Sequence, residues 1–503
     1  MNDKLPDLEL GVAAADFDQR PMLVGRVGKD AVLVVKSGNE YFAVAALCTH
    51  YHGHLVDGLL VDGTIRCPWH HACFDLKTGA VKRGPALDPL ARWQVDQQDG
   101  RIFVRRQLPR AGNAPYSADM QPESVVIVGA GAAGLAAALT LRRAGYQHRL
   151  TMVSGEPDAP YDRPNLSKDY LAGTAPEEWL PLRSDEFYRD NGIELALGAA
   201  AVKLDTKQSK LTLQGGRELS FDRLLLATGA TPVRLQIAGA DPDRVFYLRS
   251  VADCRAIIAR AAAAKRAVVL GSSFIALEVA ASLRARGLEV YVVGRDSVLM
   301  RRVLGEQVGA LLRSVHESQG IVFHLGKTIA RVDNNSVILN DGATLNADFV
   351  VVGAGVRPVD DLARTAGLAT DNGVTVDEHL MTSANGIYAA GDIASWPDQR
   401  SGERLRVEHW VVAQRLGETA ARNILGARER FTAVPFFWTQ QFDVVINYVG
   451  HASSWDKIRV DGAIENRDCA IRYERGGRVA AVATISRDMA SLLAELELEQ
   501  AAS

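Results

Sequence analysis

Two segments of the chain carry the same order of local structure: an apolar strand, a glycine-rich turn and an alanine-rich helix. The first covers residues 125–141, with glycines in G-x-G-x-x-G spacing, and the second covers residues 268–283. Glycines in such a turn permit a tight bend and let the backbone approach a pyrophosphate at the helix N-terminus. Strands alternate with helices from Ser124 onward, which predicts parallel βαβ units. The repeat therefore predicts two nucleotide-binding domains of the α/β class.

The first 107 residues have a different sequence pattern. Short strand-like runs such as 31–35 and 41–44 are separated by Gly-Asn, Asp-Gly and Thr-Gly turns, which predicts a small all-β domain. Residues 108–122 are rich in Pro, Gly, Asn and Ala and predict a linker. After residue 427, aromatic strand-like runs such as 434–438 and a helix over 488–498 predict a separate α+β domain. A chain of 503 residues is long enough for several cores.

Composition excludes several classes of function. The net charge is −3 and the chain has no basic run, which argues against a nucleic-acid partner. The longest apolar stretch, 125–141, is interrupted by glycines and is shorter than a bilayer span. The acidic N-terminus does not resemble a signal peptide, and five cysteines do not suggest a secreted disulfide scaffold. We therefore expect a cytoplasmic protein without a membrane span.

Two short segments each combine one cysteine with one histidine, Cys48 with His50 and Cys67 with His70. Two loop tips of this kind match a [2Fe–2S] cluster that has two cysteines on one iron and two histidines on the other. A structural zinc site accepts the same four ligands and is the alternative. Zinc fingers keep the cysteine pair and the histidine pair apart, whereas each loop here mixes them. The pattern therefore favours the iron–sulfur cluster.

The run 71–81, followed by Gly84-Pro85, resembles the Rieske family, and the resemblance covers residues 5–106. High-potential members of that family carry an extra disulfide between the two loops, at positions held here by Gly53 and Trp69. The resemblance therefore implies the low-potential, ferredoxin-like class, at roughly −150 mV.

Three more histidines crowd these loops, His52, His54 and His71. We expect them to form an exposed polar surface, with tuning of the cluster as the alternative. Cys73 has no ligand role in the motif and is expected to be a small buried apolar side chain.

Three later stretches resemble ferredoxin reductases and apoptosis-inducing factor. They are P-Y-x-R-P-x-L-S-K at 160–168, A-T-G-x-x-P at 227–232 and a late G-D motif at 391–392. With the Rieske segment in front, the chain resembles the Rieske-containing, apoptosis-inducing-factor-like oxidoreductases. That resemblance implies a glutathione reductase-like flavoprotein whose FAD domain is interrupted by an NAD(P)H domain. The implied domains are Rieske 1–107, linker 108–122, FAD-binding 123–248 and 359–427, NAD(P)H-binding 249–358 and C-terminal 428–503.

The resemblance also implies the residues that hold FAD. Glu156 lies about the right distance beyond the first glycine turn to be the acidic ribose ligand. In the related flavoproteins the Asp of the late G-D motif bonds the ribityl chain. The predicted FAD-binding residues are Gly129, Gly131, Ala133, Gly134, Glu156, Arg163, Thr228, Gly229, Gly391 and Asp392.

The second glycine turn is less regular, because Ser273 and Ala276 replace the usual second and third glycines. Alanine is tolerated at the third position, whereas serine at the second crowds the pyrophosphate slightly. Arg295 stands where NADH users of this family carry an acid, which favours NADPH because arginine pairs with a 2′-phosphate. A surface position for Arg295 is the alternative, so the coenzyme is written NAD(P)H. The predicted coenzyme-binding residues are Gly271, Ser273, Ala276, Glu278, Arg295 and Gly355.

Lys168 and Glu278 correspond to an ion pair that the family places beside the reactive edge of the flavin. A cation there stabilises the negative charge of reduced flavin, and the carboxylate holds the cation and faces the nicotinamide. These two residues are the predicted catalytic pair. The predicted site is completed by residues from segments that resemble those covering the flavin and nicotinamide face in the family: Glu408, His409, Trp410 and Trp438. Core packing is the alternative for the two tryptophans.

The resulting function is electron transfer from NAD(P)H through FAD and the Rieske cluster to an external one-electron acceptor such as an oxygenase or a cytochrome. A disulfide or peroxide reductase needs a redox-active cysteine near residues 165–168, and none is there. A redox-sensing or signalling flavoprotein of apoptosis-inducing-factor type, with slow turnover, is the second hypothesis. The sequence identifies neither the acceptor protein nor the oligomeric state.

Overall fold

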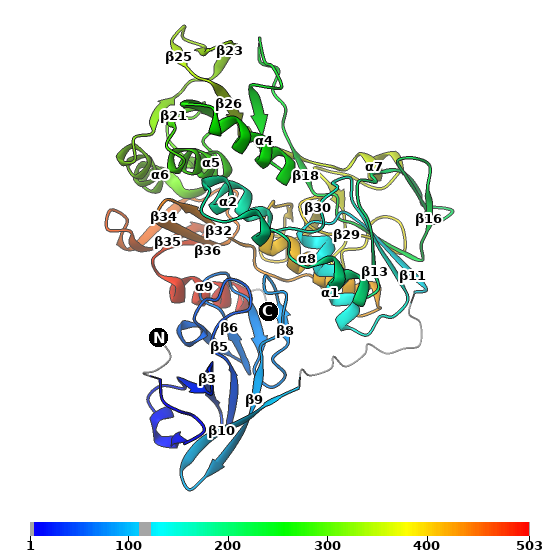
Figure 1. Cartoon of the computed structure of the whole chain (residues 1–503), viewed down its shortest axis with the longest axis vertical. Coiled ribbons are helices and arrows are strands. Elements are labelled where there is room, and N and C mark those ends of the chain that lie inside the picture. The colour runs from blue at the N-terminus through cyan, green and yellow to red at the C-terminus, as the bar shows by residue number, and fades with distance from the viewer. Residues whose placement is uncertain (1–4, 110–121, 502–503) are drawn as a thin grey trace. The chain divides into compact units, whose positions relative to one another are not determined.

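The computed structural model describes residues 5–109 and 122–501 (Figure 1). They form two compact units, one of residues 5–109, 139–146 and 487–501 and the other of residues 122–138 and 147–486. Most of the predicted linker, residues 110–121, lies outside the described residues, and the predicted domain bounds stay predictions. Within the described ranges no helix is long and apolar enough to cross a membrane.

The first unit contains two antiparallel sheets, one of six strands and one of four. The six-stranded sheet has the order β1-β10-β9-β4-β3-β2, and the four-stranded sheet has the order β5-β6-β7-β8. Their bounds are β1 Val12–Ala13, β2 Met22–Val27, β3 Asp30–Ser37, β4 Glu40–Ala45, β5 Leu59–Val61, β6 Thr64–Arg66, β7 Cys73–Asp75, β8 Val81–Arg83, β9 Arg92–Gln98 and β10 Arg101–Leu108.

Strand β3 is apolar on both faces because it separates two cores. Leu33 and Val35 pack with residues of the ligand loops and the small sheet, including Cys48, Cys67 and Ile65. Val32 and Val34 point to the opposite core. A run of consecutive apolar residues is typical of a strand that is covered on both sides, and the strand predicted at 31–35 is confirmed.

Helix α9, Asp488–Gln500, belongs to this first unit and contacts β5 (Figure 1). It is the helix that the sequence predicts over 488–498. The side chains of Leu492, Ala494 and Leu498 are buried, so the helix has an apolar side that needs a covering surface.

The second unit contains two five-stranded parallel sheets of the predicted βαβ type. The first has the order β13-β12-β11-β17-β29, in which β11 runs into helix α1, Ala132–Arg143. The second has the order β19-β26-β20-β21-β22, in which β20 runs into helix α5, Phe274–Ala285. The strand bounds are β11 Ser124–Val128, β12 Arg149–Val153, β13 Ile193–Ala196, β17 Arg223–Leu226, β29 Ile387–Ala389, β19 Val245–Tyr247, β20 Arg266–Leu270, β21 Glu289–Gly294, β22 Val322–Leu325 and β26 Phe349–Val352.

A third five-stranded sheet, antiparallel and in the order β32-β33-β36-β35-β34, follows helix α8, Trp410–Ile424. The first strand begins at Phe436, two residues later than the predicted run at 434–438, since Pro435 has no N–H for a ladder bond. The sheet bounds are β32 Phe436–Gln441, β33 Val444–Gly450, β34 Lys457–Ala463, β35 Asp468–Arg475 and β36 Arg478–Ile485.

Smaller elements complete the second unit. The remaining helices are α2 Asp169–Ala172, α3 Asp185–Asp190, α4 Val251–Ala262, α6 Arg301–Ser318 and α7 Asp361–Thr365. The remaining strands are β14 Ala201–Asp205, β15 Lys210–Leu213, β16 Glu218–Ser220, β18 Ala230–Pro232, β23 Ile329–Asp333, β24 Ser336–Leu339, β25 Thr344–Asn346, β27 Val356–Pro358, β28 Val374–Thr375, β30 Ala394–Pro397 and β31 Arg404–Leu405.

Candidate functional site

The two loops that carry the mixed Cys and His pairs have the same backbone hydrogen bonds. Cys48 N–H donates to the carbonyl five residues on, at 2.9 Å, and Cys67 N–H does the same at 2.8 Å. Four residues after each cysteine, His52 and His71 donate back to the cysteine carbonyls and adopt left-handed backbone conformations, with φ of 59° and 60°. The loops are therefore two copies of one tight turn, and each presents a cysteine at its base.

The four predicted ligands lie together as two thiols and two imidazoles. Cys48 and Cys67 are buried, and a hydrogen bond between the two thiols raises the pKa of Cys48 and lowers that of Cys67. The Nδ1 atoms of His50 and His70 are 3.2 Å apart. Burial lowers the pKa of His50 to about 3, so that imidazole is neutral and has a lone pair available for a metal.

This donor set fits a [2Fe–2S] cluster, which takes only two protein ligands for each iron. Within 5–109 and 122–501 no three or more His, Cys, Asp or Glu side chains gather as ligands of a single metal ion. No disulfide joins any of the five cysteines, all of which lie in the described ranges. Gly53 lies so close to the second loop that a Cβ on it would be 3.0 Å from the Cys67 sulfur and 3.1 Å from the Trp69 ring.

The other histidines of these loops behave differently from one another. His52 and His54 are exposed, as expected. The expectation is wrong for His71, which is fully buried and whose ring nitrogens contact Glu495 and Ser491. Cys73 is buried on β7, as expected.

The first glycine turn has the geometry that a pyrophosphate site requires. Gly129 has a φ of 120°, and a Cβ on it would lie 2.0 Å from the carbonyl oxygen of Ala227. A Cβ on Gly134 would lie 1.9 Å from the carbonyl oxygen of Gly129, so only glycine allows α1 to start this close to the turn. A Cβ on Gly131 would meet nothing within 4 Å, which leaves open space where a ligand approaches the backbone. Ala133 is buried at the start of α1.

The predicted ribose ligand Glu156 already has protein partners. Its carboxylate accepts hydrogen bonds from the Tyr161 hydroxyl at 2.5 Å and from the Arg163 guanidinium at 3.0 Å. Burial is the main cause that raises the pKa of Tyr161, so the hydroxyl keeps its proton and donates. Its role toward the ribose stays a prediction.

The A-T-G and G-D motifs follow the carboxyl ends of two neighbouring parallel strands, β17 and β29. Thr228 Oγ1 donates to the Val359 carbonyl at 2.7 Å, and the Val359 N–H donates to the Gly229 carbonyl at 2.9 Å. Asp392 pairs with Arg249 at 2.9 Å. Gly391 has a φ of 81°, which brings the carboxylate of the next residue to the end of β29.

The second glycine turn lies against the backbone of Gly353. Ser273 caps α5, and its hydroxyl donates to the Gly353 carbonyl at 3.3 Å. Ala276 is buried, and a Cβ on Gly353 would lie 2.8 Å from the Ala276 Cβ, which explains why a small residue suits the third position. A Cβ on Gly271 would lie 2.3 Å from the Gly353 carbonyl oxygen. The serine hydroxyl is therefore engaged by protein backbone.

Arg295 is exposed directly after β21, and Gly355 is exposed after β26 with a φ of 92°. Both follow the carboxyl ends of strands in the second parallel sheet, the edge at which open α/β sheets bind ligands. The role of Arg295 toward a 2′-phosphate stays a prediction.

Lys168 and Glu278 form an ion pair of 2.8 Å between segments 110 residues apart. Glu278, which is 4% exposed, has two further partners: the Ser167 hydroxyl donates to it at 2.6 Å and the Thr439 hydroxyl at 2.6 Å. The carboxylate thus accepts three hydrogen bonds, two at Oε2 from adjacent residues and one at Oε1 from Thr439. A buried charge with this many donors keeps a single position.

Of the aromatic residues predicted to cover the cofactors, Trp438 lies near this pair. The Lys168 ammonium is 5.9 Å from the centre of the Trp438 ring, and both Trp438 and Trp410 are only partly buried. His409 stacks obliquely on Phe437 at 4.6 Å, and burial lowers its pKa to about 3. Its Nδ1 is buried, and no residue of the described chain hydrogen-bonds it. Glu408 pairs with Arg406 at 2.6 Å.

Sequence reasoning missed three residues that hold these groups: Ser167, Thr439 and Arg249. Ser167 belongs to the P-Y-x-R-P-x-L-S-K stretch but was given no role of its own, and Thr439, next to Trp438, has no pattern that marks it. Arg249 is the first residue of the predicted NAD(P)H-binding segment, and only the fold places it against Asp392.

Comparison with known proteins decides the family. Residues 123–417 match the family described as pyridine nucleotide-disulphide oxidoreductase. The chain belongs to this oxidoreductase family. Residues 11–94 of this oxidoreductase match the Rieske [2Fe-2S] domain, and residues 436–502 match the reductase C-terminal domain. The predicted resemblance and fold class are confirmed.

The oxidoreductase is similar to curated proteins over most of its length. Human apoptosis-inducing factor 3 is 33% identical over 492 residues, which cover 94% of this chain and 81% of that protein. Rhodocoxin reductase of Rhodococcus erythropolis is 34% identical over 369 residues, 72% of this chain and 86% of that protein.

Solved structures of ferredoxin reductases are also similar to this chain. The putidaredoxin reductase–putidaredoxin covalent complex matches with a TM-score of 0.73 and 31% identity over 76% of this chain and 94% of that chain. The ferredoxin reductase for the CYP199A2 system of Rhodopseudomonas palustris matches with a TM-score of 0.71 and 34% identity over 76% of this chain and 97% of that one. The chain is therefore a ferredoxin reductase-type oxidoreductase fused to a Rieske domain, and the predicted cofactors, FAD, NAD(P)H and a [2Fe–2S] cluster, are confirmed.

Proposed function

We propose that the protein passes electrons from NAD(P)H through FAD to its own Rieske cluster and on to an external one-electron acceptor protein. Each hydride brings two electrons and a proton to the flavin, and the electrons leave singly, so one NAD(P)H reduces two acceptor molecules. The observation that carries the proposal is the presence, in one chain, of a reductase-type site and of two matched Cys/His loops.

The residues of the chain have separate tasks in this proposal. Cys48 and Cys67 supply thiolates to one iron, and His50 and His70 supply neutral imidazoles to the other. The glycine turns hold the two pyrophosphates against backbone N–H groups. Lys168 supplies a fixed positive charge beside the flavin, and Glu278 holds that charge in place. The exposed Trp69, at the tip of the second ligand loop, is available to an acceptor.

Cofactor content gives the first test. Aerobically purified protein is expected to contain one FAD, two irons and two acid-labile sulfides per chain, since two thiols and two imidazoles suit a [2Fe–2S] cluster. Metal analysis, labile-sulfide assay and flavin absorbance measure this directly. Stoichiometric zinc without labile sulfide would contradict the assignment.

Coenzyme preference gives the second test. Arg295→Glu is expected to shift the ratio of NADPH to NADH efficiency by about tenfold towards NADH, about 1.4 kcal/mol, the scale of one charge-assisted contact. Stopped-flow reduction of the flavin by each coenzyme gives the ratio. Arg331→Glu, at an exposed arginine on β23, is the control. An unchanged ratio in Arg295→Glu would show that this side chain does not meet the coenzyme.

A redox-sensing role is the second candidate, because human and mouse apoptosis-inducing factor 3 match across 94% of the chain. Such a protein would turn over slowly with every acceptor and would change its oligomeric state when the coenzyme binds. Fast reduction of a protein acceptor without such a change favours electron transfer.

A further inference from the structure

Three polar side chains lie on one side of helix α9 at a spacing of four residues: Ser491, Glu495 and Glu499. This spacing places them on one face of a helix. In most terminal helices a face with two carboxylates is exposed to solvent. Here Ser491 and Glu495 are completely buried and the Glu499 side chain is only 21% exposed. The acidic face of α9 is therefore turned into protein.

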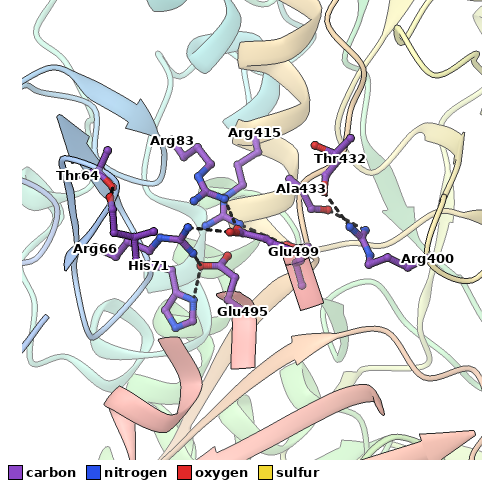
Figure 2. A network of polar contacts seen from close by, with 12 residues as sticks. Thr64, Arg66, His71, Arg83, Arg400, Arg415, Thr432, Ala433, Glu495 and Glu499 are labelled. Atoms are coloured by element: carbon purple, nitrogen blue, oxygen red, sulfur yellow. Dashed lines mark hydrogen bonds and ion pairs between the residues drawn. The ribbon is translucent and has the colours of Figure 1, made fainter. Parts of the chain in front are cut away.

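The partners of this face come from the Rieske segment (Figure 2). The Arg66 guanidinium contacts Glu495 at 3.4 Å and Glu499 at 2.7 Å, and Arg83 pairs with Glu499. The His71 ring has Nδ1 3.1 Å from the same Glu495 oxygen and Nε2 3.1 Å from the Ser491 hydroxyl. Each of the three polar side chains of the α9 face therefore has a partner in the Rieske segment.

These contacts bracket one ligand loop. Arg66 immediately precedes Cys67, and His71 immediately follows His70. Both side chains meet a single atom, Oε2 of Glu495. One buried carboxylate on the last helix therefore holds both ends of the loop that carries the second Cys/His pair. The equivalent histidine of the first loop, His52, is exposed, so the brace applies to the second loop alone.

We infer that α9 is a built-in brace of the Rieske segment and that Glu495 is a positioning residue for the loop of Cys67 and His70. The inference rests on the proposed role of those two residues as cluster ligands. Glu495 acts in two ways: it fixes the ends of the loop, and it keeps a negative charge beside it. Loss of that charge favours the reduced, more negative cluster and raises its midpoint potential.

The test compares Glu495→Gln with Glu497→Gln in the full-length protein. Glu497 is an exposed acid on the same helix, so its variant changes the net charge equally. Glu495→Gln is expected to keep two irons and two labile sulfides but to raise the midpoint potential in a spectroelectrochemical titration. It is also expected to release iron to a chelator about tenfold faster, the scale of one charge-assisted hydrogen bond. Glu497→Gln is expected to match the wild type in both measurements.

Ser491→Ala keeps every charge and removes only the hydroxyl that meets His71, so it serves if Glu495→Gln fails to fold. It is expected to release iron faster than the wild type, with an altered electron paramagnetic resonance spectrum of the reduced cluster. If Glu495→Gln and Ser491→Ala both match the wild type, α9 does not brace the loop and the inference is overturned. A wild-type protein without labile sulfide would instead overturn the proposed function, so the two failures are distinguishable.

Discussion

His70→Ala is expected to abolish electron delivery to a one-electron protein acceptor while NAD(P)H still reduces the flavin at nearly the wild-type rate. A hydride carries two electrons and a proton, which a one-electron cluster cannot accept, so entry does not depend on the cluster. Electron exit does depend on the cluster, because His70 is one of only four predicted protein ligands. Acceptor reduction is expected to fall by at least about 100-fold, since loss of a residue that merely supports a metal ligand costs up to that much.

Two measurements on this variant separate electron exit from electron entry. Steady-state cytochrome reduction measures exit, and stopped-flow flavin reduction measures entry. His54→Ala is the matched control, because His54 is an exposed histidine of the same region without a ligand role in the motif. It is expected to keep both activities. Full acceptor reduction by His70→Ala without a working cluster would mean that electrons leave from the flavin directly, and the proposed path would be wrong.

Lys168→Ala is expected to slow hydride transfer from NAD(P)H by about 100-fold, about 2.7 kcal/mol in activation free energy, with FAD still bound. The lysine is held at 2.8 Å from a carboxylate that is itself fixed by Ser167 and Thr439. Such a preorganised charge favours the negative charge that flavin gains on reduction. Stopped-flow flavin reduction measures the rate, and flavin absorbance after gel filtration measures binding.

Two further variants distinguish catalysis from folding. Lys210→Ala removes a lysine from an exposed ion pair, Lys210 with Glu218 at 3.0 Å, and is expected to leave hydride transfer unchanged. Thr439→Val removes one hydrogen bond to Glu278 and is expected to slow the reaction less than Lys168→Ala does. Should Lys168→Ala reduce its flavin at the wild-type rate and only unfold at a lower temperature, the lysine is structural.

The sequence alone was sufficient for features whose residues are neighbours in the chain. The turn at Gly129 and Gly134 brings a strand close to the helix that follows it. The G-x-G-x-x-G spacing indicates this close approach within one short segment. The paired spacings at Cys48 and Cys67 predict two like turns for the same reason, and the two loops share their hydrogen bonds. A run of consecutive apolar residues placed β3 within a few residues, because this strand is buried on both faces, and the helix predicted over 488–498 is α9.

Contacts between side chains far apart in the chain were not evident from the local sequence. The pairing of Lys168 with Glu278 was reached only through resemblance to a family, since nothing in either segment alone points to the other. Thr439, 161 residues beyond Glu278, was missed because a lone threonine within a strand has no signature. The same holds for Arg249, whose contact with Asp392 spans 143 residues.

His71 shows most clearly what the tertiary structure decides. Its position in a polar loop beside His70 predicted exposure, which is the usual state of such residues. Instead, a helix more than 400 residues later in the chain covers it with Ser491 and Glu495, and the ring becomes fully buried. Local pattern determines which groups a loop can present. Whether water or a carboxylate meets them depends on which distant surface has complementary shape and charge, and that surface exists only after the chain has folded.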